Sequence, residues 1–116
     1  MEQNRDLRAA CQRLHSQRAW LPKELRGTYA GLAHPATLSY LQDLGVTSIE
    51  LLPIQAKQSE LFLQERGRVN YWGYSDARYF APEASYATKR SQKTGAAAVR
   101  QEVIDMVRAL HEPDSK

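Results

Sequence analysis

A single segment of this 116-residue chain has the pattern of a buried strand. Residues 46–53 read Val-Thr-Ser-Ile-Glu-Leu-Leu-Pro, a short β-rich run closed by proline. The backbone N–H and C=O groups of a buried strand need partners on both sides, and the sequence predicts no second strand to supply them. The chain therefore resembles a slice of a larger α/β fold.

Helical patterns flank this predicted strand. Residues 35–44 begin with a proline, whose missing N–H suits the first turn of a helix, and leucines recur there every three residues. Gly45 follows where a helix end favours a left-handed residue. Residues 96–111 carry a broad apolar face, and residues 5–17 predict a shorter helix. Helix, glycine and buried strand form half of a βαβ unit, which predicts a parallel sheet.

Residues 54–94, between the predicted strand and the last helix, show little periodicity. Connections in α/β units usually contain about 2–6 residues, so this one is far longer than normal. Such loops are either functional or disordered, and the density of aromatic residues between 71 and 86 argues against disorder. The sequence therefore predicts an ordered, functional loop.

Composition narrows the class of protein. The chain is 42% hydrophobic and has no run of about 18 apolar residues, which argues against a membrane span. Its first residues lack the apolar core of a signal peptide, and a single cysteine, Cys11, favours a reducing compartment. We therefore expect a cytoplasmic protein. Its 16 basic and 13 acidic residues are interspersed, so the net charge of +3 predicts a mixed, solvated surface.

Motifs for metals, cofactors and nucleophiles are missing. The three histidines are scattered, with no other residue at metal-ligand spacing, and there is no Ser-His-Asp arrangement, phosphate loop or dinucleotide fingerprint. We expect neither a metal nor a cofactor. His34 directly precedes the helix predicted at 35–44, and we expect it to cap that helix or lie on the surface.

The stretch Asn70-Tyr71-Trp72-Gly73-Tyr74 is the strongest functional signal. Aromatic faces stack on the C–H surfaces of sugars, and phenol oxygens bond to hydroxyl groups, so three rings within five residues suit a sugar site. Gly73 is expected to allow a backbone angle or a close approach that a Cβ would block. Asn70 is expected to brace the turn through its side chain.

This stretch, together with residues 26–32, also resembles a known family. Residue types, order and spacing are similar to those of the glycogen-debranching and isoamylase branch of the α-amylase-type glycoside hydrolases. The matching stretches are residues 24–35, 41–47, 49–54, 70–74, 79–82, 86–87 and 106–111.

The resemblance implies an α/β fold, a fragment of a (β/α)8 TIM barrel that covers about residues 21–111. Residues 1–20 would be an extra N-terminal helix and residues 112–116 a tail, both outside the family. The implied barrel pieces are the first helix at 35–44, the second strand at 47–53, the long loop at 54–94 and the second helix at 96–111. Because barrel enzymes build active sites from the loops that follow their strands, the aromatic loop would lie on the functional face.

The resemblance also implies a substrate and its contacts. In that family, the tyrosine after Trp-Gly, here Tyr74, stacks beneath the sugar ring at the bond being cleaved. Trp72, Tyr71 and Asn70 either touch the substrate or shape the loop. The implied substrate is an α-glucan, such as glycogen or maltodextrin, that is hydrolysed at its α-1,6 branch linkages.

The carboxylates depart from the family pattern. The family's catalytic nucleophile, acid/base and stabilising carboxylates lie on later strands, which have no counterpart in this sequence. Glu60 and Glu65 are expected to be solvated, and Ser75-Asp76 stands where the family usually has Asn-Thr or Met-Thr. We therefore expect a truncated debranching-type glycosidase, inactive alone and with no catalytic residue.

Other interpretations stay open. The chain could be a non-catalytic fragment that binds α-glucan or another partner, and a weaker hypothesis assigns nucleic-acid binding to Lys89, Arg90 and Lys93. A partial barrel would also have uncovered edges, which would allow self-association. No membrane partner is expected. Arg26 and Tyr29 are expected mainly to pack their own loop.

Overall fold

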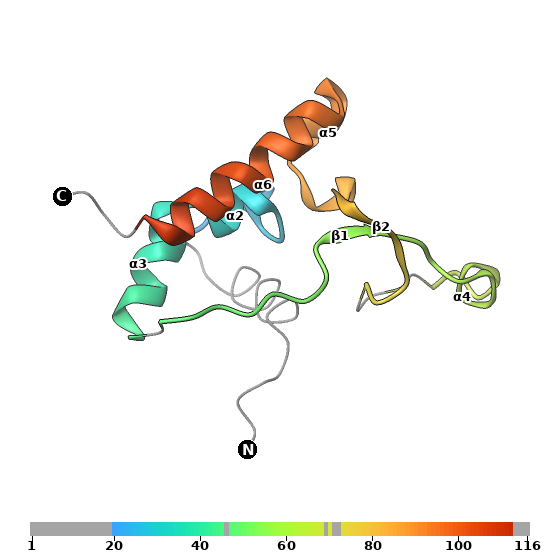
Figure 1. The fold of residues 1–116 in the computed structure, drawn as a ribbon, viewed down its shortest axis with the longest axis horizontal. Helices are drawn as coiled ribbons and strands as arrows, with labels where there is room; N and C mark the ends of the chain where they lie inside the picture. The colour runs from blue at the N-terminus through green and yellow to red at the C-terminus, as the bar shows by residue number, and fades with distance from the viewer. Residues whose placement is uncertain (1–19, 46, 69, 71–72, 113–116) are drawn as a thin grey trace, which may run out of the picture.

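The computed structural model describes residues 20–45, 47–68, 70 and 73–112, and Figure 1 shows their arrangement. The elements in chain order are η1 (Lys23–Leu25), α2 (Tyr29–Leu32), α3 (Pro35–Asp43), β1 (Gln55–Lys57), α4 (Leu61–Glu65), β2 (Asp76–Pro82), η2 (Ala84–Tyr86), α5 (Lys89–Thr94) and α6 (Ala96–His111). Across these described ranges, every helix is too short or too polar to cross a lipid bilayer.

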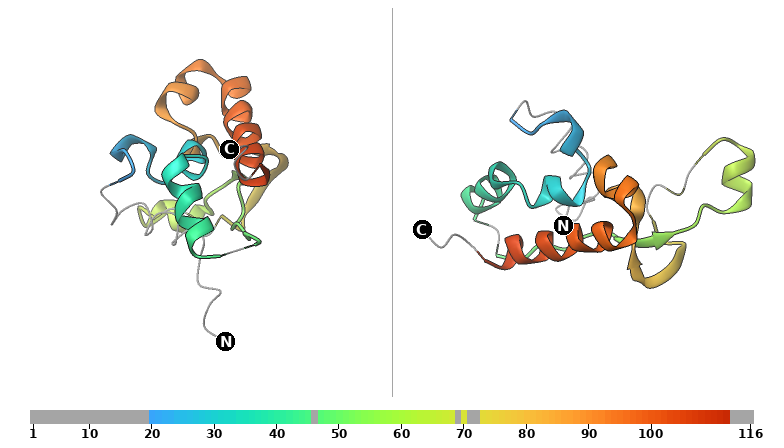
Figure 2. Two further views of the ribbon diagram at one scale, coloured as in Figure 1. Left: turned by 90° about the vertical axis from the view of Figure 1, so that its left-hand side faces the viewer. Right: turned by 90° about the horizontal axis from the view of Figure 1, so that it is seen from above.

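The core lies along the inner face of α6. Val99 and Met106 of this helix are buried against Tyr29 of α2 and Ala87, which follows η2. Both views in Figure 2 place α2 beside α6, as does the front view. Partly buried side chains surround this cluster: Leu32, Ala33, Leu51, Ile54, Tyr86, Val103 and Leu110.

The two long helices form where the sequence predicts them. In α3, Pro35 occupies the first turn and the His34 side chain caps the helix, its Nδ1 accepting a hydrogen bond of 3.3 Å from the Ala36 N–H. The helix ends at Asp43, and Gly45 adopts a φ of 69°, the left-handed conformation expected after a helix end. The range of α6 is the predicted 96–111. The helix predicted at 5–17 lies outside the described residues.

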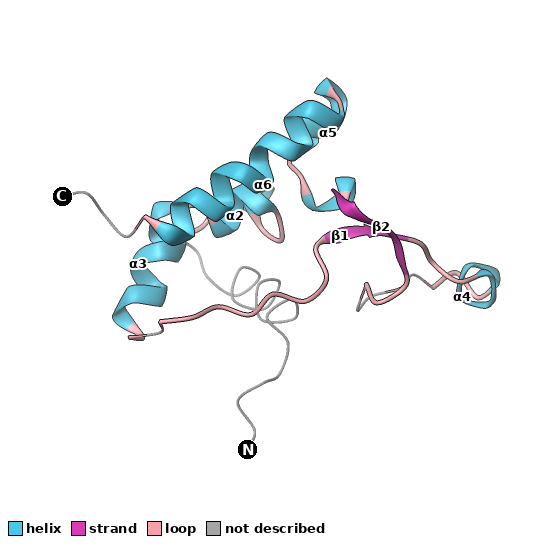
Figure 3. Cartoon of the chain, in the orientation of Figure 1, coloured by secondary structure: helices cyan, strands magenta, loops and turns pink. Residues whose placement is uncertain are grey.

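The strand predicted at 47–53 is wrong. Described residues 47–53 have no strand assignment, and the loop colour in Figure 3 shows their course. Within the part of the chain that the structure describes, the two strands of the sheet pair only with each other. A strand pattern cannot become a strand without a neighbouring strand to bond to. The apolar side of the segment still takes part in packing, since Leu51 lies against the core cluster.

The sheet is an antiparallel pair, not the parallel sheet that the sequence predicts. Strand β1 pairs with β2, joining Gln55 to Pro82 and Lys57 to Asp76, with shifts in register between these pairs. Both strands lie within the stretch predicted as an irregular loop. The described chain is therefore a small α/β unit in which helices pack near a two-stranded hairpin.

Candidate functional site

The candidate sugar-binding turn is represented among the described residues by Asn70, Gly73 and Tyr74, and its asparagine is buried. Asn70 is 8% exposed, and its Oδ1 accepts a hydrogen bond of 2.9 Å from the Gly73 N–H. Gly73 is buried and has a φ of 78°, a conformation that side chains with a Cβ rarely adopt. The predictions that Asn70 braces the turn and that Gly73 supplies an unusual backbone angle are confirmed. Tyr71 and Trp72 lie outside the described residues.

Tyr74 leaves this turn with its side chain 66% exposed. The buried hydrogen bond between Asn70 and Gly73 therefore fixes the backbone next to Tyr74, whose ring faces solvent. An exposed tyrosine face on a braced turn has the form of a stacking platform for a sugar. Whether Tyr74 contacts a sugar stays a prediction.

Strand β1 and the residues that follow it make further hydrogen bonds with Asn70. The Lys57 ammonium donates a hydrogen bond of 2.7 Å to the Asn70 carbonyl oxygen, and the Ser59 hydroxyl oxygen accepts one of 3.0 Å from the Asn70 N–H. The Asn70 side-chain amide lies 3.5 Å from the Gln58 carbonyl oxygen. Asn70 is thus tied both to its own turn and to the hairpin. Local sequence patterns do not indicate the part that Lys57 plays, because its contacts lie 13 and 29 residues along the chain.

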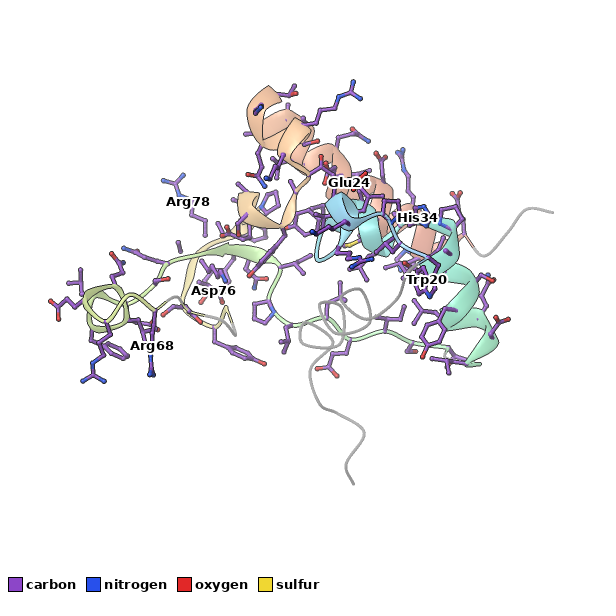
Figure 4. All side chains as sticks on the ribbon, turned by 180° about the vertical axis from the view of Figure 1, so that it is seen from behind. Trp20, Glu24, His34, Arg68, Asp76 and Arg78 are labelled. Atoms are coloured by element: carbon purple, nitrogen blue, oxygen red, sulfur yellow. The ribbon has the colours of Figure 1, made fainter. Side chains whose placement is uncertain are left out.

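A shallow pocket of about 320 Å³ lies next to Tyr74 in the chain and is lined in part by Asp76, which is labelled in Figure 4. Its lining comes from the segment after β1 and from the start of β2: Gln58, Ser59, Glu60, Leu61, Ser75 and Asp76. The Ser75 hydroxyl donates a hydrogen bond of 2.6 Å to Glu60 Oε1, and this bond lowers the pKa of the Glu60 carboxyl. The expectation that Glu60 is solvated is wrong, since it is partly buried and its Oε2 is shielded from solvent.

The hairpin and α4 expose further apolar side chains that sequence reasoning did not single out. Phe80 is fully exposed on β2, and α4 projects away from the rest of the fold in Figure 2. The exposed large apolar side chains on these two elements are Leu61, Phe62, Tyr79 and Phe80. Strand β2 presents four successive exposed residues, so the alternation of buried and exposed positions that marks a half-buried strand is missing.

Tyr29 connects this region to the core instead of forming part of the site. Its side chain is 2% exposed, and its hydroxyl lies 2.8 Å from the Ile54 carbonyl oxygen and 3.0 Å from that of Glu83. Arg26 Nε donates a hydrogen bond of 3.2 Å to the Leu21 carbonyl oxygen. The prediction of packing within its own loop is confirmed for Arg26, whereas Tyr29 is a core residue that contacts segments 25 and 54 residues away.

The described residues include exposed basic side chains but no metal-binding cluster. Among the described side chains, no group of three or more His, Cys, Asp or Glu residues is placed to hold a metal ion. Lys89, Arg90 and Lys93 all lie exposed on the short helix α5. In Figure 1, α5 and α4 extend from different parts of the fold.

Glu83 is the second carboxyl with a shifted pKa. Burial raises the pKa of this carboxyl, but hydrogen bonds from the Ser85 hydroxyl and from the backbone N–H groups of Lys57 and Ser85 outweigh it, with help from the Lys57 charge. The pKa of Glu83 therefore lies below its ordinary value of 4.5.

We expect the stability of the fold to fall in acid partly through Glu83. A carboxyl whose folded-state pKa is depressed stabilises the fold above its ordinary pKa of 4.5 and loses this contribution as the pH falls through the folded value. Denaturant unfolding at several pH values from about 6 to 3 should show a smaller loss of unfolding free energy for Glu83→Gln than for the wild type. The exposed Glu65→Gln variant is the matched control, and equal slopes for the two variants would contradict the prediction.

Comparison with known proteins gives close relatives over most of the chain. No family model matches it. It is 49% identical over 92 residues to a glycogen debranching enzyme of Yersinia enterocolitica and 48% identical over 91 residues to one of Yersinia pestis. It is 46% identical over 91 residues to a glycogen operon protein, a GlgX homologue, of Haemophilus influenzae. These alignments cover 78–79% of this chain but 13% of each relative's length.

Proposed function

Because this chain is a homologue of the bacterial glycogen debranching enzymes over most of its own length, we propose that it forms part of an α-glucan site of that type. Tyr74 would be the stacking platform, with Trp72, Tyr71 and Asn70 shaping or touching the sugar-binding turn. The observation that carries the proposal is the pairing of a buried, hydrogen-bonded Asn70 and Gly73 with a Tyr74 side chain that is 66% exposed.

We further propose that residues 21–111 correspond to the early part of a (β/α)8 barrel, with 1–20 and 112–116 outside it. In that setting α3 would be the first barrel helix and α6 the second. Segment 47–53 would become a strand once neighbouring strands supplied partners for its backbone groups. The aromatic turn would then lie among the loops that form a barrel active site.

The family activity proposed for the complete site is hydrolysis of α-1,6 linkages in glycogen. Retaining glycosidases place two carboxyl groups about 5–5.5 Å apart across the bond, and the general acid has a raised pKa. Glu60 does not suit the role of general acid, since its hydrogen bond with Ser75 lowers the pKa of its carboxyl. Binding of α-glucan without catalysis is therefore the proposed activity of the 116 residues by themselves.

A glycogen pull-down at low and high salt tests the proposed binding. Stacking on a neutral sugar should be nearly independent of salt, whereas phosphate contacts weaken steeply as salt rises. We expect equal retention on glycogen at both salt concentrations and loss of retention with Tyr74→Ala. Retention that is lost at high salt would instead favour the basic residues of α5 and a nucleic-acid partner. No retention of the wild type at either salt concentration would refute the proposal.

We expect the 116 residues alone to release no reducing sugar from glycogen, pullulan or maltooligosaccharides, because the catalytic carboxylates implied by the family resemblance have no counterpart in this sequence. The measurement is a reducing-sugar assay on the purified chain, with the Yersinia enterocolitica enzyme as a positive control. Release that disappears in Glu60→Gln or Asp76→Asn would contradict the prediction and assign the chemistry to the pocket beside the turn.

A further inference from the structure

Lys57 lies where the hairpin, the core and the candidate sugar-binding turn meet. Its ammonium group donates a hydrogen bond of 2.7 Å to the Asn70 carbonyl oxygen and stands 5.1 Å from the centre of the Tyr86 ring. A cation over an aromatic face and a short bond to a carbonyl both favour one fixed position of the ammonium group. The side chain therefore connects two segments that are 13 and 29 residues away.

The backbone at Lys57 is itself fixed. Its N–H donates a hydrogen bond of 3.0 Å to Glu83 Oε2, and the Glu83 N–H donates one of 2.9 Å to the Ile54 carbonyl oxygen. Tyr86 packs edge-on against the buried Tyr29 ring, with 6.0 Å between ring centres. This chain of contacts leads from the core to Asn70 through the Lys57 ammonium group.

The other contacts of Asn70 do not replace this one. The Ser59 hydroxyl and the Gln58 carbonyl both belong to the irregular segment after β1, where the Gln58 N–H bonds to the Ser75 carbonyl oxygen beside Tyr74 and not to the core. Lys57 is the contact of Asn70 that starts from the strand and also touches the core ring of Tyr86.

We propose that Lys57 is a positioning residue, which fixes Asn70 to the core, and through the Asn70 Oδ1 bond also Gly73, and thereby sets the direction in which Tyr74 presents its ring to an α-glucan. The last part rests on the proposed function, while the fixing of the turn does not. A long cationic side chain is required, because the group must reach the carbonyl and remain over the ring. Arginine keeps a long cationic side chain whose N–H groups can donate to the carbonyl while the guanidinium lies over the ring.

The experiment compares Lys57→Met, Lys57→Arg and a control, Lys23→Met, which removes an exposed lysine on η1. Two quantities are measured on the full chain: hydrogen exchange of the Gly73 amide by NMR and the dissociation constant for maltoheptaose. Loss of a hydrogen bond from a charged donor typically shifts an equilibrium about tenfold or more. We expect Lys57→Met to speed Gly73 exchange and to weaken maltoheptaose binding by about tenfold each, with Val103 exchange in α6 unchanged.

The controls separate positioning from general stability. Lys57→Arg should restore both quantities to within about twofold of the wild type, and Lys23→Met should change neither. Unchanged Gly73 exchange in Lys57→Met would overturn the inference, as would failure of arginine to restore it or an equal loss of protection at Val103. If the wild type fails to bind maltoheptaose while Lys57→Met still speeds Gly73 exchange, the proposed glucan site fails and the fixing of the turn by Lys57 stands.

Discussion

We expect Tyr74→Ala to lower turnover about 30- to 150-fold when residues 21–110 of this chain replace the matching segment of a full-length relative. This range corresponds to about 2–3 kcal/mol, the scale of a well-packed aromatic contact. A platform beneath the reacting sugar interacts more strongly as positive charge develops on the ring, so its loss affects the transition state more than the bound ground state. Steady-state kinetics on a branched glucan should show a large fall in kcat and a small change in KM.

Companion variants decide whether the effect belongs to the ring of Tyr74. Tyr74→Phe should be milder, because the aromatic face remains and only the hydroxyl is lost. Tyr79→Ala is the matched control, since Tyr79 is 73% exposed on β2 and is assigned no role. Trp72→Ala should instead raise KM and lower thermal stability together. Normal turnover in Tyr74→Ala with abolished turnover in Trp72→Ala would show that Trp72, and not Tyr74, is the stacking platform.

The elements that sequence predicted well are those specified by neighbouring residues. Helix α3 begins at Pro35 and is followed by Gly45 with a positive φ, and α6 repeats apolar residues over sixteen positions. The brace between Asn70 and Gly73 spans three residues, so it too could be anticipated from local turn chemistry. Such features need no knowledge of distant segments.

The features that sequence missed depend on residues far apart. The segment 47–53 has a strand pattern but no neighbouring strand within the described residues, whereas β1 and β2 pair although β1 contains three residues and the register shifts between pairs. Helices α4 and α5 are too short for an apolar period to be recognised. A composition of aromatic and polar residues therefore predicts that a stretch is unusual, but not which hairpin it forms.

The candidate site shows the same division. The exposure of Tyr74 could be anticipated from an aromatic turn, but the Lys57–Asn70 bond could not, because it joins positions 13 residues apart whose alignment depends on the hairpin. Glu60 has an ordinary loop sequence around it, and its bond to Ser75 spans 15 residues. Contacts of this kind are decided by tertiary structure, which local patterns do not specify.

We expect Tyr29→Ala to remove most of the cooperative stability of the chain. The side chain is 2% exposed, and its ring packs edge-on against Tyr86 at the centre of the small core. Truncating a large buried aromatic residue to alanine costs about 3–5 kcal/mol, while small domains are stable by about 0.05–0.15 kcal/mol per residue. Because few side chains of the described residues are fully buried, such a loss is a large part of the total. Urea unfolding followed by circular dichroism should show a broad transition at low urea or none.

Tyr29→Phe separates the ring from the hydroxyl. The hydroxyl lies within hydrogen-bonding distance of the Ile54 and Glu83 carbonyl oxygens, so it joins α2 to both sides of the hairpin. Its removal should cost about 1–2 kcal/mol, because the ring still fills its space while the one hydroxyl proton shared between the two carbonyl oxygens is lost. Tyr79→Ala, an exposed change on β2, should leave the urea midpoint almost unaltered. A Tyr29→Ala midpoint equal to that of Tyr79→Ala would show that the fold is not held together at the contact of α2 with α6 and the hairpin.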